Sequence, residues 1–573
     1  MRRFSYDISN LRGDLFGGLT AGIVALPLAL AFGVQSGMGA IAGLYGAIGL
    51  GIFAAIFGGT RVQVSGPTGP MTVVTSLIVL TTIESAGSLE KGFGLIISIF
   101  FLAGVFLIVL GLFKIGTYIE YIPYSVVSGF MTGIGIIIIV FQLFPALGHS
   151  SPSSIIGVFQ GLPKALKDLN LETLVLTGAT IAIIYLFPKI TKLIPSTLVA
   201  LLLVSGINAW VHLNVPLIGD IPKGLPEIRL SEWTLSGMDL GLLIKFALTL
   251  AFLGAIDSLL TSRIADNVTK TKHNSNQELI GQGIGNMFAA SIGGIPGAGA
   301  TMRTLVNVNS GGRTRLSGVA HGIVLLTILM GLGPYASQIP LAVLAGILIT
   351  VGVGIIDYKG IRHIRDIPRA DASVMIIVLG LTIFVDLIQA VAAGMIMASI
   401  LFMKQMSDLV TGDLKISPLN AYKKELPWDD EMIPSHIADK IYVKHFDGPL
   451  FFGFAPAFQE LAKKLPSDIR IVIFRMKKVP HIDQTGLYAM EEVILELESR
   501  GIAVVISGLL EQPKNMLKRI NIIPGLIPEQ YIFQNFKQCL EWLNDELLDR
   551  EKEDMHQFFN ALIIDREKLK LLL

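Results

Sequence analysis

The 573-residue sequence is poor in charge. Charged residues make up only 16% of the chain, against about 25% in a typical soluble protein, while 52% of residues are hydrophobic and the mean hydropathy is +0.65. The sequence therefore predicts a protein that crosses a membrane many times. The net charge of +1 provides no basic excess for a nucleic-acid partner.

Cysteine is almost absent. The single Cys539 excludes an internal disulfide, and its charged neighbours Lys537 and Glu541 suit a domain in a reducing cytosol. Nothing before Leu15 resembles a cleavable signal peptide, so we expect the first apolar run to begin the permanent membrane domain.

Motifs for catalysis are also missing. The sequence shows no Walker motif, no Ser/His/Asp or Cys/His arrangement and no metal cluster, so we do not expect an enzyme. The segment 311–315 lacks the Gly-Lys-Ser/Thr ending of a phosphate loop, and we interpret it as a tight cytoplasmic turn. His273 has no second ligand at helical spacing, which favours a polar loop over a metal site.

Long apolar runs fill the first 410 residues instead. We predict about fourteen membrane segments, several of them too short to span alone. Their ranges are 15–34, 39–58, 68–83, 93–113, 123–147, 171–188, 193–211, 241–262, 277–292, 300–310, 315–333, 338–356, 371–388 and 390–408.

Basic residues alternate between the junctions of these segments. With the N-terminus in the cytoplasm, the even-numbered junctions hold most of them, as the positive-inside rule requires, and fourteen spans return the C-terminus to the cytoplasm. Those residues are Arg61, Lys114, Lys189, Lys192, Arg263, Lys270, Lys272, Arg313, Arg315, Lys359, Arg362, Arg365 and Arg369. The odd junctions hold Lys91, Lys164, Lys167, Lys223 and Arg229.

Two of the segments are interrupted by glycine and proline. The interruptions, 65–72 and 293–303, fall in the third and tenth segments, which are the third of each set of seven. Because seven is odd, the second set is inverted relative to the first. We therefore expect two half-helix amino termini to meet near the middle of the membrane, where their dipoles favour an anion.

Charge becomes dense after Met406. We predict a transmembrane domain at 1–410, a linker at 411–438, a small α/β domain at 439–549 and a C-terminal tail at 550–573. Within the α/β domain we expect strands at 440–454, 470–476 and 502–509 and helices at 485–500, 512–520 and 534–548.

Several motifs resemble the SulP anion permeases, relatives of the animal SLC26 exchangers, over nearly the whole chain. They are DLFGGLTAGIVALPLAL at 14–30, the Gly-Leu-Tyr at 43–45, FGGTRVQVSGPTGPMT at 57–72, the segment 293–315, and a C-terminal domain similar to a STAS module. The stretches AIDSLLTSR at 255–263, TKHNSNQELIGQGIG at 271–285 and GAGATMR at 297–303 are most similar to the cyanobacterial sodium-dependent bicarbonate transporters of this family. The resemblance implies a seven-plus-seven inverted repeat with core and gate domains, an elevator-like motion and a homodimer with a cytoplasmic STAS domain.

Asp257 is the one acid that we place well inside a long apolar segment. Thr261 lies one turn later on the same helix face, so a carboxylate and a hydroxyl can converge on one ion. The resemblance implies Na⁺ at Asp257, Thr261, Gly299, Ala300 and Thr301. The alternatives are that Asp257 bonds a neighbouring helix, or that it carries a proton and couples transport to H⁺.

The resemblance implies that bicarbonate touches Thr68, Ala300 and Thr301. Arg303 lies in the first turn of the restarted helix, where animal relatives use an arginine in their anion site. Here the alternatives are a salt bridge or a snorkelling contact for Arg303 and helix caps for the two threonines.

In the STAS-like domain, Thr485 corresponds to the serine that is phosphorylated in anti-sigma-factor antagonists. Phosphate at a helix N-terminus is electrostatically favourable, and the alternative is that Thr485 is an N-cap.

We thus expect a Na⁺:HCO₃⁻ symporter of the plasma membrane. The alternatives are proton-coupled sulfate or dicarboxylate uptake, anion exchange, or a signalling protein whose membrane part senses an anion.

Overall fold

The structure of the protein is a computed structural model that describes residues 10–119, 121–152, 154–191, 194–219, 225–234, 239–385, 387–412, 416–418, 441–451, 458, 465–466 and 469–548. The chain forms two compact units, Met1–Ala398 and Ser399–Leu573. The predicted tail at 550–573 and most of the predicted linker lie outside the described residues.

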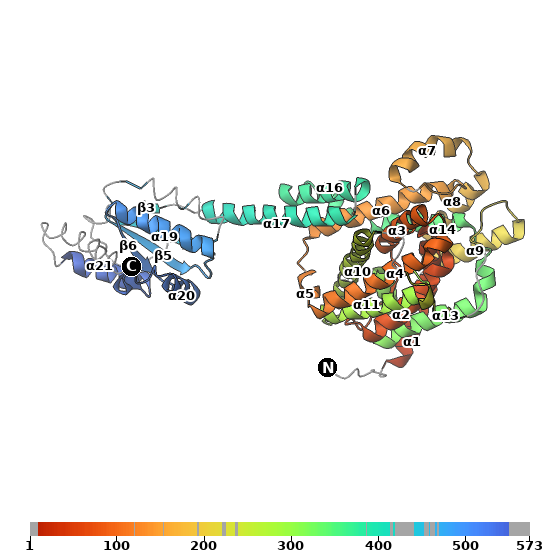
Figure 1. The fold of residues 1–573 in the computed structure, drawn as a ribbon, viewed down its shortest axis with the longest axis horizontal. Coiled ribbons are helices and arrows are strands. Elements are labelled where there is room, and N and C mark those ends of the chain that lie inside the picture. Colours follow the sequence, from red (N-terminus) through yellow and green to blue (C-terminus); the bar gives the residue numbers. More distant parts are fainter. Residues whose placement is uncertain are drawn as a thin grey trace. The chain divides into compact units, whose positions relative to one another are not determined.

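Each of the fourteen predicted membrane segments coincides with one helix (Figure 1). The first seven helices are α1 (Leu11–Gln35), α2 (Ala40–Phe57), α3 (Gly69–Ala86), α4 (Leu89–Leu112), α6 (Tyr124–Ala146), α8 (Leu171–Leu186) and α9 (Ser196–Val211). The second seven are α10 (Leu240–Thr269), α11 (Ser275–Ser291), α12 (Thr301–Asn309), α13 (Arg315–Ala336), α14 (Leu341–Ile355), α16 (Arg369–Phe384) and α17 (Leu387–Gly412). Among the described residues, eight helices are long and apolar enough to cross a membrane, and three further apolar helices are shorter.

Three α-helices among the described residues were not predicted. They are α5 (Gly116–Ile119), α7 (Ile155–Lys167) and α15 (Tyr358–Arg362). Ser154 caps α7 by accepting the Gly157 amide, and Val158 and Ala165 pack this helix against α6. The sequence did not predict α7 because two glycines and a proline interrupt its helical pattern.

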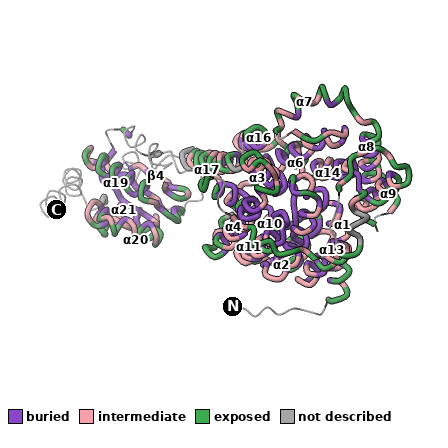
Figure 2. Tube along the Cα trace, turned by 45° about the vertical axis from the view of Figure 1, so that its right-hand side comes forward, coloured by how far each residue is buried: buried purple, intermediate pink, exposed green. Residues whose placement is uncertain are grey.

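The helices of the first unit pack as two groups. In one group α11 contacts both α2 and α4, α13 contacts α1 and α2, and α10 contacts α3, α4 and α12. In the other, α14 packs against α6 and α8, and α16 packs against α6. Figure 2 shows long buried stretches in α2 and α10 and more exposed surface on α7 and α9. Both helix breaks lie in the first group, before α3 and before α12.

Two very short strands cross between the breaks. β1 (Ser65–Gly66) pairs antiparallel with β2 (Ala298–Gly299), with Ser65 opposite Gly299 and Gly66 opposite Ala298. All four residues are buried.

The second unit is built on a five-stranded sheet of order β3-β4-β5-β6-β7. Its strands are β3 (Ile416–Pro418), β4 (Ile441–Asp447), β5 (Ile471–Lys478), β6 (Ala503–Ser507) and β7 (Ile532–Phe533), and only β3 is antiparallel to its neighbour. Apolar side chains of α19 (Gln484–Ser499) and α20 (Glu511–Arg519) cover one face, and those of α21 (Phe536–Leu548) cover the other.

The predicted elements of this unit agree with the structure except at the edges of the sheet. β3 lies inside the segment that we predicted as a linker, and β7 was not predicted. The predicted strand at 440–454 is wrong at its end, because β4 stops at Asp447 and Gly448 follows with a positive φ of 92°.

Candidate functional site

The two helix breaks meet at the β1–β2 crossing. Besides the strand pairing, the Ala300 amide donates to the Val64 carbonyl at 2.9 Å. A Cβ on Gly297 would collide with the backbone of Gly66, so the two segments approach as closely as only glycine allows. Segments separated by more than 200 residues in the sequence are thereby held in contact.

α3 and α12 both begin at this crossing. Thr68 directly precedes α3, Ala300 directly precedes α12, and neither first turn receives a side-chain cap from the described residues. Because the strands are antiparallel, the helices leave the crossing in opposite directions with their amino ends near each other. The free N–H groups and the positive ends of two helix dipoles make this place favourable for an anion.

α10 places hydroxyl groups against β2. The Thr261 hydroxyl donates to the Gly299 carbonyl at 2.9 Å and lies 2.7 Å from the Thr301 hydroxyl. The Ser258 hydroxyl accepts the Gly299 amide at 3.0 Å. Three of the predicted cation ligands, Thr261, Gly299 and Thr301, are thus in direct contact.

Asp257 is buried on the same helix. Among the described residues, its Oδ2 atom has no hydrogen-bond partner, and the carboxylate interacts electrostatically with the Arg303 guanidinium. A buried carboxylate oxygen without a donor is free to bind a cation. Together with the oxygens of Thr261, Gly299 and Thr301 it offers the all-oxygen surroundings that suit Na⁺.

The predicted anion residues lie at the same crossing. Thr68 is the N-cap residue of α3, but its hydroxyl is buried and bonds none of the described residues. Thr301 is not the N-cap of α12, because Ala300 takes that position and the Thr301 hydroxyl bonds Thr261. The Ala300 amide donates to the Val64 carbonyl, and the Ala300 carbonyl accepts the Thr304 amide. Because its side chain is a methyl group, Ala300 contributes only backbone atoms to the site.

Arg303 connects the two helix breaks within the interior of the protein. Its side chain is 1% exposed, and Nη2 donates to the Pro67 carbonyl at 2.7 Å, which rules out a snorkelling contact. Nε and Nη1 are buried and bond none of the described residues, and Nη1 occupies the space that a Cβ on Gly66 would need. A permanent positive charge therefore lies directly behind the amino ends of the two half-helices.

Two further buried acids were not predicted as such. Glu278 at the start of α11 and Asp14 at the start of α1 are 1% and 0% exposed, so Asp257 is not the only acid buried in this unit. Glu278 follows the N-cap Asn274 and a run of polar residues, which made it resemble part of a surface loop. Its position four residues before Gln282, on the same face of the glycine-rich α11, is the one signal that pointed to the interior.

The other residues singled out from the sequence lie apart from the crossing. His273 bonds the Asp266 carboxylate at 2.7 Å, and the turn at 311–315 is held by Asp14, which accepts the Arg313 and Thr314 amides. Thr485 is exposed in the first turn of α19, where the N-cap is Asp483, so the interpretation of Thr485 as an N-cap is wrong.

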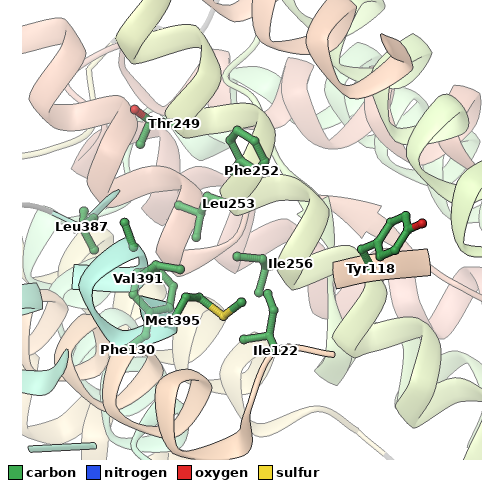
Figure 3. A pocket seen from close by; sticks show the side chains of 11 residues that line it. Tyr118, Ile122, Phe130, Thr249, Phe252, Leu253, Ile256, Leu387, Val391 and Met395 are labelled. Atoms are coloured by element: carbon green, nitrogen blue, oxygen red, sulfur yellow. The ribbon is translucent and has the colours of Figure 1, made fainter. Parts of the chain in front are cut away.

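An apolar cavity of about 380 Å³ lies beside α10 (Figure 3). Leu253 and Ile256 of α10 face Phe130 of α6 and Val391 and Met395 of α17 across it. Because this lining offers almost no polar atoms, the cavity is no place for a small anion. α10 thus lines the cavity with Leu253 and Ile256 and the polar site with Asp257, Ser258 and Thr261.

Free helix ends and a buried oxygen cluster between two broken apolar helices are features that secondary transporters share at their substrate sites. The chain belongs to the sulfate permease family, which matches residues 11–378, and the STAS domain family matches residues 433–565. The STAS match begins within the predicted linker and extends into the predicted tail.

Relatives support this assignment over nearly the full length. The chain is 41% identical over 532 residues to the bicarbonate transporter BicA of Picosynechococcus sp., covering 91% of this chain and 93% of that protein. It is 40% identical over 556 residues to the bicarbonate transporter BicA of Synechocystis sp., covering 95% and 96%. Among solved structures, the transmembrane domain of a cyanobacterium bicarbonate transporter BicA is similar, with 43% identity, a TM-score of 0.63 and coverage of 67% of this chain and 98% of that chain.

Proposed function

We propose that this protein is a symporter that carries Na⁺ together with HCO₃⁻ across the plasma membrane. The observation that carries this proposal is the buried Asp257 carboxylate, whose Oδ2 atom bonds none of the described residues, on the same helix as Thr261, which contacts Gly299 and Thr301 beside two uncapped helix ends. The similarity to two proteins named as bicarbonate transporters supports the choice of anion.

Cation coupling gives uptake a physical basis. An interior-negative potential opposes entry of a monoanion by about 2.3 kcal/mol per 100 mV. A cation that moves with the anion removes this cost and adds the energy of its own gradient. Asp257 supplies the negative charge that such a cation needs, and the helix ends with Thr68, Ala300, Thr301 and Arg303 supply the positive surroundings for the anion.

In this proposal the membrane unit has fourteen spans in a seven-plus-seven inverted repeat. The helix contacts support it. In an inverted repeat, α1, α2 and α4 of the first half correspond to α10, α11 and α13 of the second. The contact of α4 with α11 then corresponds to that of α13 with α2, and the contact of α1 with α13 corresponds to that of α10 with α4. The distribution of basic residues supports cytoplasmic N- and C-termini.

We further propose an elevator-type motion in a homodimer. Every residue of the site lies on α3, α10, α12 or the β1–β2 crossing, all within one of the two helix groups. That group can therefore move past the other group and carry the complete site with it, without breaking the contacts among the ligands.

Sulfate is the second candidate, since the family is named after it and Arg303 has two donor nitrogens, Nε and Nη1, that bond none of the described residues. A divalent oxyanion would use that additional positive charge better than bicarbonate would.

Uptake of H¹⁴CO₃⁻ and ³⁵SO₄²⁻ into proteoliposomes, with and without an inward Na⁺ gradient, tests the proposal. We expect Na⁺ to stimulate bicarbonate uptake and sulfate uptake to be slow. A response to an imposed pH gradient but not to Na⁺ would replace Na⁺ by H⁺. Absence of turnover with either anion would favour a sensor and contradict the proposal.

A further inference from the structure

A fully buried carboxylate lies one layer behind the proposed cation site. Oε2 of Glu278 accepts the Gly59 and Thr60 amides, each at 2.8 Å. Oε1 accepts the side-chain amides of Gln63 at 2.8 Å and Gln282 at 2.7 Å. Four N–H donors surround the carboxylate and fix its orientation.

One arm of this network reaches the cation ligands through Gln63. The Gln63 side-chain oxygen accepts the Ser262 hydroxyl at 2.9 Å, and Ser262 directly follows Thr261 on α10. The Gln63 amide also packs directly on Gly299, because a Cβ at that position would overlap it. The position of Gln63 therefore determines how closely Gly299 approaches α10.

A second arm reaches the same residue through β1. The Gln282 side-chain amide also donates to the Ser65 hydroxyl at 2.6 Å. Ser65 is the residue paired with Gly299 in the β1–β2 crossing. Glu278 thus holds both the side chain and the strand that lie against Gly299.

We propose that Glu278 is a positioning residue for the coupling cation. It does not bind the ion; through Gln63 and Gln282 it holds the Gly299 carbonyl at the distance from Asp257 and Thr261 that the ion requires. This inference rests on the proposed Na⁺ coupling. Outer residues that orient a metal ligand typically contribute about 10- to 100-fold in affinity.

The substitution Glu278→Gln tests the proposal, because it keeps the volume of the side chain but replaces an acceptor oxygen by an NH₂ group among four donors. In H¹⁴CO₃⁻ uptake by full-length protein in proteoliposomes, we expect the half-saturating Na⁺ concentration to rise about tenfold. The KM for bicarbonate at saturating Na⁺ should change by less than about twofold. The Na⁺ concentration that stabilises the purified protein against heat should rise by the same factor as in uptake.

Asp14→Asn is the matched control. Asp14 is also a buried carboxylate that accepts two backbone amides, those of Arg313 at 2.7 Å and Thr314 at 3.0 Å, but it lies at the turn after α12. We expect this variant to lower the unfolding temperature and to leave the half-saturating Na⁺ concentration unchanged.

Ser65→Ala removes only the last bond of the second arm and leaves all four donors of Glu278 in place. We expect a severalfold rise in half-saturating Na⁺, and this variant decides the question if Glu278→Gln does not fold. A wild type without a Na⁺ response would overturn Na⁺ coupling and this role together. A Na⁺-responsive wild type whose folded variants keep its Na⁺ dependence would overturn the role of Glu278 alone. Equal rises in the Na⁺ and bicarbonate constants would also overturn it, since they would indicate general distortion.

Discussion

At the scale of single residues, the site is held together by bonds between groups that lie far apart in the sequence, such as that of Thr261 to Gly299 and that of Arg303 to Pro67. Asp257 and Thr261 are one helical turn apart, so their spacing predicted that these two side chains converge, whereas Thr301 was expected beside them only from the resemblance to known transporters. The bond of Arg303 to the Pro67 carbonyl, 236 residues earlier, could not be predicted, because a backbone acceptor leaves no trace in the sequence. The burial of Glu278 was missed for a similar reason, since two of its four donors are backbone amides.

Asp257→Asn should remove Na⁺ stimulation of anion uptake. Asparagine keeps the size of the side chain but cannot supply the negative charge that offsets the desolvation of a cation in a buried site. We expect the Na⁺-dependent part of H¹⁴CO₃⁻ uptake to fall by at least about tenfold, measured as initial rates in proteoliposomes with and without Na⁺.

Asp239→Asn provides the control for this change on the same helix. Asp239 is the N-cap of α10 and accepts the Leu242 amide, a role that asparagine fulfils equally well. Its Na⁺ response should match that of the wild type. Retention of full stimulation in Asp257→Asn would remove Asp257 from the cation site.

At the scale of elements, long apolar helices could be predicted from their composition, whereas contacts between two backbone segments could not. The two breaks were found from their glycines and prolines, and each predicted apolar segment coincides with a helix. The β1–β2 pairing has two residues per strand, too few to show an alternating pattern. The edge strands β3 and β7 were missed for the same reason, because they have only three and two residues.

Gly297→Ala should disable the crossing. The added Cβ would lie within van der Waals overlap of the Gly66 carbonyl, and both partners are backbone that cannot rotate away. We expect uptake to be lost and the protein to be destabilised by roughly 1–3 kcal/mol, observed as a lower unfolding temperature in detergent.

Gly354→Ala is the matched control, since Gly354 lies exposed inside α14 with nothing within 4 Å of an added Cβ. Alanine favours a helix over glycine by about 1 kcal/mol, so this variant should be as stable as the wild type or more so and should transport normally. A Gly297→Ala protein with wild-type uptake would show that the backbones do not meet this closely.

At the scale of the whole molecule, the change in charge density after Met406 was enough to divide the chain. Contacts between residues divide the chain at Ala398 instead. The density of charged residues rises only near the end of α17, whereas the tertiary contacts already change within that helix. The second unit has its own sheet and two apolar clusters, one on each face, and α21 closes one of them over Cys539. Because Cys539 is the single cysteine of the chain and lies on the buried face of α21, the reactivity of its thiol reports whether the second unit is folded.

Cys539 should be protected from thiol reagents while the second unit is folded. The thiol is 0% exposed, and burial raises its pKa to about 12, so both access and thiolate formation are suppressed at neutral pH. We expect maleimide to label full-length protein at least about 100-fold more slowly in buffer than in concentrated urea, with Cys539→Ser as the unlabelled control. Because labelling requires α21 to leave the sheet, its urea midpoint should report unfolding of the second unit and should not move when Na⁺ and bicarbonate are added to occupy the membrane site. Labelling that is equally fast in buffer and in urea would mean that α21 does not cover the sheet.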